Sequence, residues 1–345
     1  MVVKMIDRFI IEIASNHAGD PSRFNHYCKL ASDLDAELKF QIFDCKSLCH
    51  SSYKFIDDLS SVSLSFGTWK SLIVRCLDNG LKLWLEPFDH SSLEFCREFS
   101  SDVSVKVPSC DALLTNISDL SMFKETGFAI GGLSINEISR LYDQIKGLHN
   151  VLFFYGFQAF PTHINDINIS KLDFICKNFD TPIVYADHTD LMLDNKCLMD
   201  IVSIARSYSC GIERHICLNY NDLYDTVSAS EPSDLTSLFE ILRSADLSSE
   251  SFSSDLLNKS SNFSYNEFTP SELHYRSNMQ KKVVLCNTLM PNEPILSSSV
   301  QFLRTTSDDD ILSFDFMRLL SEHNLFASHQ LSEGHILKLS DLLLR

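Results

Sequence analysis

The 345-residue sequence lacks several features that would assign it to a class at once. Its eleven cysteines contain no CxxC pair, and no apolar run reaches the roughly 18 residues of a membrane span. The first residues, MVVKMIDRFIIEI, are too short and too interrupted by charge for a signal peptide. These absences argue against a disulfide-linked secreted scaffold and a membrane-spanning helix, so we expect a cytoplasmic protein with reduced thiols.

Basic residues are also scarce. The chain has 29 Lys and Arg against 46 Asp and Glu, which gives a formal net charge of −17. A surface of this sign repels a nucleic-acid backbone and an anionic membrane, so neither is expected as a partner. A bound phosphate would have to be held by a few local lysines.

The apolar residues that are present follow a repeating pattern. Short β-branched and aromatic runs alternate with segments of helical period such as SRFNHYCKLASDL and SINEISRLYDQIKG. The eight runs span residues 8–13, 37–43, 81–88, 103–109, 127–132, 150–157, 181–188 and 210–216. Eight strands with intervening helices predict an α/β fold, a (β/α)₈ TIM barrel.

The pattern changes after the eighth run. EPSDLTSLFEILRSAD predicts a closing helix, and the Ser- and Asn-rich stretch that follows has little periodicity. We therefore expect a barrel domain over 1–245, a linker over 246–279 and a small α+β domain over 280–345.

Polar residues gather near the ends of the predicted strands, where the active sites of this fold are built. They are Glu12, Lys39, Gln41, Glu86, Lys106, Ser109, Gln158, Asp187, His188, Glu213 and His215. A single lysine at such a position is more often a solvated charge on the rim. The recurrence of polar residues at six or more strands favours a site.

His188 and His215 lie at the ends of two consecutive predicted strands, and neighbouring strands lie about 5 Å apart in a parallel barrel. Two imidazoles could share a metal ion, and manganese, zinc or iron would each suit them. The alternative is that both rings bond to loop backbone. No third protein ligand is evident, so a metal site here would be open and catalytic.

Lys39 and Lys106, with Ser109 nearby, could hold a phosphate or a carboxylate. A desolvated lysine could instead form a Schiff base with a keto acid. Glu12, Glu86 and Glu213 are candidate acid–base groups, although each could be an ion-pair partner of a lysine, and for Glu86 we favour that alternative.

The motifs resemble those of the N-acetylneuraminate (sialic acid) synthase family. EIASNHAGD, LKFQIFD, EPFD, KVPSCD, GGLSINEI, FPTHINDINI, DHTD and ERHICLN occur in the order and spacing of that family. The tail, with QKKVVLCNTLMPNEPI and SVQFLRT, is similar to its small antifreeze-like (SAF) domain.

The resemblance implies that phosphoenolpyruvate condenses with an N-acyl-mannosamine or related amino sugar, releasing phosphate and giving a nonulosonic acid. It implies that His188 and His215 hold a divalent metal, Mn²⁺ with Mg²⁺ or Co²⁺ as alternatives. The other implied roles are phosphoenolpyruvate binding by Lys39, Lys106, Ser109, Gln158 and Phe160, contact with a metal-bound water by Gln41, sugar contacts and proton movement by Glu12 and Glu213, and further substrate contacts by Asp187 and Asp225. Arg304 matches an arginine that enters the partner's barrel, which implies a domain-swapped homodimer.

The sequence departs from the family at several pocket positions. Other residues stand where hydroxyl, thiol, amide or histidine side chains are usual, and they are Glu86, Ile130, Gly131, Tyr155, Gly156, Gln158, Phe160, Ala186 and Thr226. Each lost hydrogen bond weakens binding by roughly 0.5–1.5 kcal/mol. These departures make a non-catalytic sugar-phosphate-binding homologue the first alternative to a synthase. A Schiff-base keto-acid lyase that uses Lys39 or Lys106 is the second.

Overall fold

The structure, a computed structural model, describes residues 8–190, 196–222, 224–244, 263–306 and 310–345. The chain forms two compact units. The first contains the chain up to Phe43 and Ser61–Leu273, and the second contains Asp44–Ser60 and His274–Arg345. Among helices in these described ranges, none has the length and apolar composition needed to cross a bilayer.

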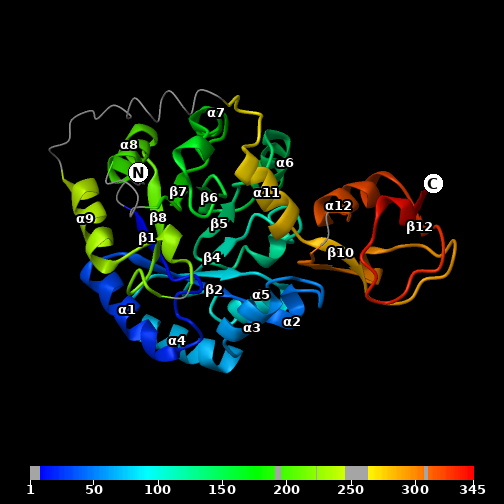
Figure 1. The fold of residues 1–345 in the computed structure, drawn as a ribbon, viewed down its shortest axis with the longest axis horizontal. Helices are drawn as coiled ribbons and strands as arrows, with labels where there is room; N and C mark the ends of the chain where they lie inside the picture. Colours follow the sequence, from blue (N-terminus) through cyan, green and yellow to red (C-terminus); the bar gives the residue numbers. More distant parts are fainter. Residues whose placement is uncertain (1–7, 191–195, 223, 245–262, 307–309) are drawn as a thin grey trace. The chain divides into compact units, whose positions relative to one another are not determined.

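The first unit is a closed barrel of eight parallel strands, which confirms the predicted fold (Figure 1). Each strand pairs with its neighbours in chain order, and β1 pairs with β8 to close the ring. The two-residue strand β9 (Ala229–Ser230) adds to β8. The eight barrel strands are β1 (Phe9–Glu12), β2 (Glu37–Ile42), β3 (Leu83–Pro87), β4 (Ser104–Val107), β5 (Thr126–Ala129), β6 (Val151–Tyr155), β7 (Ile183–Asp187) and β8 (Gly211–Ile216).

Helices lie around the ring of strands (Figure 1). Those of the first unit are α1 (Phe24–Asp33), α4 (Phe66–Asp78), α5 (His90–Arg97), α6 (Ile135–Ile145), α7 (Ile169–Asn178), α8 (Lys196–Tyr208) and α9 (Pro232–Arg243). The crossover from β4 to β5 contains only a 3₁₀ turn, Ile117–Asp119, in place of a helix. Side-chain caps define several helix starts. Ser134 and Glu137 form a capping box on α6, for example, and satisfy main-chain N–H groups that the helix leaves unpaired.

Alternation along the strands separates two apolar clusters. A small one fills the barrel with Ile10, Trp84, Ala129, Leu152, Phe154 and Val184. A larger one, which includes Phe40, Phe128 and Tyr185, packs the outer strand faces against the helices. Because successive side chains of a strand point to opposite faces, these clusters fix which polar residues face inward.

The second unit is a small α+β structure with its own core, which includes Val283, Ile295 and Phe316. Its elements are α2 (Cys45–Leu48), the antiparallel pair β10 (Lys282–Leu285) and β11 (Val300–Leu303), α12 (Ser313–Glu322), and the antiparallel pair β12 (Leu325–Ala327) and β13 (Leu342–Leu344). Two further helices, α3 (Ile56–Val62) and α11 (Pro270–Met279), cross a boundary between the units.

The unit boundaries differ from those expected from the sequence. Residues 44–60 join the second unit because main-chain bonds of 2.9 Å connect Arg304 to Leu48 and to His50. Residues 270–279, which we expected within the linker, form α11. Thr269 and Glu272 exchange bonds of 3.0 and 3.2 Å that cap its start. Residues 246–262 of the expected linker lie outside the described residues.

Candidate active site

Five charged side chains meet inside the barrel, and we call them the ion cluster. Its members come from five strands: Glu12 (β1), Lys39 (β2), Glu86 (β3), Lys106 (β4) and Glu213 (β8). Their side chains are at most 6% exposed. We expected both lysines near the ends of their strands. Lys39 is instead the third residue of β2 and Lys106 the third residue of β4, and neither is the last residue of its strand. Both lysine side chains point into the barrel, and their ammonium groups therefore lie in the same cluster.

Lys39 contacts three carboxylates. Its Nζ lies 2.8 Å from an oxygen of Glu86 and 2.8 Å from an oxygen of Glu213, and it also pairs with Glu12. The other oxygen of Glu12 accepts the Ala14 N–H at 2.9 Å. A buried charge is costly unless it is paired, and these three ion pairs offset that cost for the ammonium.

Lys106 lies beside the same carboxylates. Its Nζ is 2.7 Å from Glu213 Oε1 and 3.6 Å from Glu86 Oε1. It also sits 4.8 Å from the centre of the Phe154 ring, which adds a cation–π contact. Glu86 is thus an ion-pair partner of both lysines, the alternative that we favoured for it.

Burial and ion pairing oppose each other in this cluster. Burial lowers the pKa of Lys39 to about 8, although the Glu213 and Glu86 carboxylates act in the other direction. Burial also acts to lower the pKa of Lys106, but Glu213 and Glu86 outweigh it and raise that pKa. For Glu213, burial is outweighed by the two ammoniums, which lower its pKa to about 2. At neutral pH the cluster therefore has two cations and a firmly ionised Glu213.

His188 and His215 lie next to each other, with ring centres 4.9 Å apart. Burial lowers the pKa of His188 to about 3 and the pKa of His215 well below its usual value. Both Nδ1 atoms are buried without a hydrogen-bond partner in the described part of the chain. Neutral imidazoles with open nitrogens are the form that binds metal, so this pair fits a divalent ion. No group of three or more His, Cys, Asp or Glu side chains within the described ranges could hold one, which leaves a two-histidine site with open positions.

Asp187 is not part of this arrangement. Val184, three residues earlier on β7, faces the barrel interior. Because successive side chains alternate between the faces of a strand, Asp187 points to the outer face of β7. There it forms a buried ion pair with Arg214, while Thr189 Oγ1 donates to its other oxygen at 2.6 Å. Arg214 also donates to Ser230 Oγ at 2.9 Å. The substrate role expected for Asp187 therefore has no geometric support.

The departures at the ends of β5, β6 and β7 pack against one another. A Cβ on Gly131 would lie 2.3 Å from the Gly156 carbonyl oxygen and 2.5 Å from Gln158 Nε2. A Cβ on Gly156 would lie 2.3 Å from the Ala186 carbonyl oxygen. Gln158 thus fills the space that a side chain at 131 would need. These residues form a coupled set, which we call the small-residue patch: Gly131, Gly156, Gln158 and Ala186.

The remaining predicted residues occupy several places. Gln41 is half-buried and lies opposite Glu86 in the β2–β3 register. Ser109 is buried two residues after β4. Phe160 is 49% exposed, with its ring 4.4 Å from that of His188. Asp225 is exposed and accepts the Ser15 N–H at 3.1 Å, which ties it to the loop after β1.

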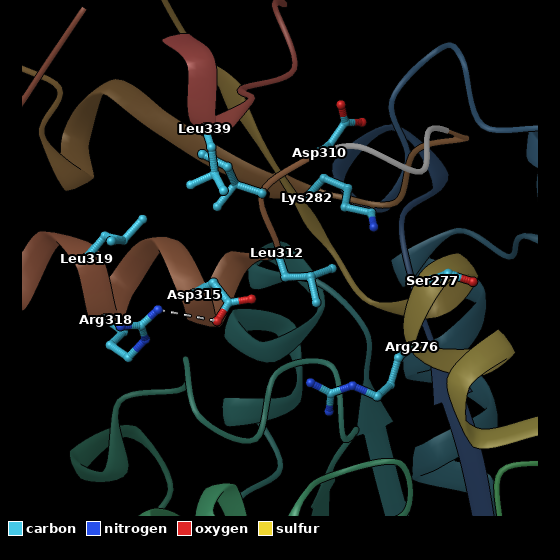
Figure 2. Close-up of a pocket in the computed structure, with 10 residues that line it drawn as sticks. Arg276, Ser277, Lys282, Asp310, Leu312, Asp315, Arg318, Leu319 and Leu339 are labelled. Carbon is cyan, nitrogen blue, oxygen red and sulfur yellow. Dashed lines mark ion pairs between the residues drawn. The ribbon is translucent and has the colours of Figure 1, made fainter. Parts of the chain in front are cut away.

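Arg304 lies in the second unit and is buried. The structure contains one chain, so its predicted entry into a partner's barrel stays a prediction. The second unit also has a cavity of about 670 Å³ (Figure 2). Cationic Arg276, Lys282 and Arg318 and acidic Asp310 and Asp315 are among its lining residues. Arg318 lies 4.0 Å from Asp315, and no predicted site residue lines the cavity.

Two residues that contact the site or its supporting strands were not predicted from the sequence. Arg214 stands between Glu213 and His215 in β8, and the presence of an arginine within a buried strand was the signal that could have shown it. Phe154, beneath Lys106, had no signal because an aromatic residue in a strand is ordinary.

Comparisons with known proteins agree with this fold. A solved structure of the spore coat polysaccharide biosynthesis protein spsE from Bacillus subtilis matches with a TM-score of 0.79 and 17% identity, covering 98% of this chain and 95% of that one. An N-acetylneuraminic acid (sialic acid) synthetase from Leptospira borgpetersenii serovar Hardjo-bovis, solved with citrate, matches with a TM-score of 0.58 and 19% identity, covering 78% and 90%. At these identities the likeness shows the fold alone.

Sequence comparison gives the family. An uncharacterized protein of Methanocaldococcus jannaschii is 23% identical over 219 residues, which are 61% of this chain and 62% of that relative. The match therefore spans less than two thirds of the relative's length. The NeuB family model matches residues 26–253, which include most of the barrel and four of the five members of the ion cluster. The chain therefore belongs to the NeuB family.

Proposed function

We propose that this protein condenses phosphoenolpyruvate with the open-chain aldehyde of an N-acyl-mannosamine or a related amino sugar. The observation that supports this most is the ion cluster beside the histidine pair in a chain of the NeuB family. Two ammoniums can bind the anionic groups of the donor, and the adjacent imidazoles could hold a metal ion that polarises the aldehyde oxygen.

The reaction balances with water as the third reactant. The methylene carbon of phosphoenolpyruvate bonds to the aldehyde carbon, water adds at the carbon that carries the phosphate, and phosphate leaves. Lys39 and Lys106 would hold the phosphate and carboxylate of the donor throughout. Glu12 and Glu213, which contact these ammoniums, would contact the sugar and assist proton movement as water adds.

His188 and His215 would hold the divalent metal, which we propose to be Mn²⁺. When bound, this ion supplies Lewis-acid polarisation of the aldehyde oxygen. Gln41, on the inner face of β2, would contact a water of the metal. Asp225, exposed near the loop after β1, would orient sugar hydroxyls, with Phe160 covering His188.

The test is phosphate release. Purified protein is incubated with Mn²⁺, phosphoenolpyruvate and each of a panel of N-acyl amino sugars, including six-deoxy diacetamido sugars. We expect release of phosphate and formation of a keto acid with a defined sugar. The His215→Gln variant should show neither, while His163→Gln, at an exposed histidine, should match wild type. Silence of the wild type across the panel would contradict the proposal.

A non-catalytic sugar-phosphate-binding homologue is the second candidate. The small-residue patch favours it, because Gly131, Gly156 and Ala186 bring no side-chain hydrogen-bonding group to their side of the barrel. Calorimetric binding of a sugar phosphate without Mn²⁺ uptake or turnover would support this candidate over the synthase.

We also propose that residues 280–345 form an antifreeze-like domain that works in a domain-swapped homodimer through Arg304. Light scattering after size exclusion should give twice the 39.2 kDa chain mass. Mixing inactive Arg304→Ala with inactive Lys106→Met should then restore part of the activity in mixed dimers. A monomer with full turnover would contradict the swap.

A further inference from the structure

The ion cluster contains one more carboxylate than it has ammoniums. Glu12, Glu86 and Glu213 surround Lys39 and Lys106, so the five side chains together have one surplus negative charge when all are ionised. An uncompensated charge is expensive in a buried site. One carboxylate is therefore less strongly held than the other two.

The distances identify Glu86 as that carboxylate. Glu213 lies within 2.8 Å of both ammoniums, and Glu12 is fixed by Lys39 and by the Ala14 N–H. Glu86 has one short contact of 2.8 Å with Lys39 and a long one of 3.6 Å with Lys106. Its side chain, 5% exposed, is also less buried than those of Glu12 and Glu213, at 0% and 2%.

A displaced Glu86 carboxylate has a neighbour that could receive it. Gln41 stands directly opposite Glu86 in the β2–β3 register and is half-buried. Its amide N–H groups can donate to a carboxylate, so a change of Glu86 rotamer need not leave the charge without a partner.

We propose that Glu86 is a specificity-determining residue that competes, as an internal anion, with the ligand's anionic group for Lys39 and Lys106. The ligand class is an organic phosphate or carboxylate, and its identity as phosphoenolpyruvate rests on the proposed function. A single small anion must displace Glu86 to reach both ammoniums, so wild-type affinity for such anions is low. Removal of the Glu86 charge leaves the cluster neutral and frees one contact position on each ammonium.

The experiment measures binding of inorganic phosphate by calorimetry to the full chain. We expect Glu86→Gln and Glu86→Thr to lower the Kd for phosphate at least tenfold relative to wild type. Glu94→Gln removes the same charge from an exposed residue of α5 that pairs with Arg97, and it should leave the Kd unchanged. Thermal melting of each variant verifies that it is folded.

The opposite results would overturn the inference. They are an unchanged or raised Kd in the Glu86 variants, undetectable phosphate binding by every variant, or loss of folding in both Glu86 variants, which would make Glu86 a structural anchor. Turnover is scored separately. Tighter phosphate binding without turnover in any variant leaves this inference standing and contradicts the proposed function. Turnover in wild type without tighter phosphate binding in the Glu86 variants contradicts this inference and supports the proposed function.

Discussion

The two sides of the barrel mouth are built in opposite ways. The side formed by β1–β4 and β8 carries the ion cluster, in which every member has a charged partner. The side formed by β5–β7 carries the small-residue patch, where main chains approach too closely for a Cβ at Gly131 or Gly156. Charge pairing fixes the first side and close packing fixes the second. Substitutions on the two sides should therefore lower the unfolding free energy for different physical reasons.

The largest effect is expected at Lys106. Lys106→Met leaves Glu213 and Glu86 with Lys39 as their only cation in the cluster, and breaking a buried pair in this way costs about 3–5 kcal/mol of unfolding free energy. Urea unfolding measures the loss. Lys70→Met, at an exposed lysine 2.7 Å from Glu98, should cost less than about 1 kcal/mol. Equal costs in the two variants would show that burial of the cluster does not matter.

The second prediction concerns how the stability contribution of Glu213 changes at acidic pH. The pKa of Glu213 is about 2 in the folded protein against a reference value of 4.5, so the unfolded chain binds more protons between these values. This residue's contribution, roughly 3 kcal/mol, is present above pH 4.5 and is lost as the pH falls towards 2. The stability gap between wild type and Glu213→Gln should therefore narrow over that window. A gap that stays constant would contradict the ion pairing.

A third substitution tests the packed side. In Gly131→Ala the new methyl group meets the Gly156 carbonyl oxygen and Gln158, so we expect a loss of about 1–3 kcal/mol that is equal at pH 7 and pH 4. Gly147→Ala is the control, because no atom lies within 4 Å of a Cβ placed there. A Gly131→Ala variant as stable as the control would mean that the patch tolerates side chains.

The smallest effect is expected at Tyr155, on β6. Its hydroxyl is buried and has no hydrogen-bond partner in the residues that the structure describes. Tyr155→Phe should therefore change the unfolding free energy by less than about 1 kcal/mol, in contrast to the charged side of the barrel. A thermal melt measures it, and a loss above about 2 kcal/mol would reveal a partner elsewhere in the chain.

The barrel was predictable because its strands and helices have different apolar periods, which local sequence displays. The inward direction of Glu12, Lys39 and Lys106 follows from the same alternation. The outward direction of Asp187 could also have been read from its position after Ala186. The contact of Glu86 with both lysines could not have been predicted from the sequence, because it depends on how β2, β3 and β4 are staggered in the closed ring. The 44–60 segment joins the second unit through main-chain bonds, which leave no mark on side-chain pattern.

The pairing of β8 with β1 has a consequence for how the chain folds. Lys106 and its nearest carboxylate, Glu213, are 107 residues apart, and Glu213 reaches the cluster only when β8 closes the ring. Contacts of such long sequence separation form late, because loop-closure entropy opposes them. A chain that has not yet closed its barrel therefore holds two lysines without their strongest partner. The Lys106–Glu213 ion pair should therefore form together with the β1–β8 pairing during refolding.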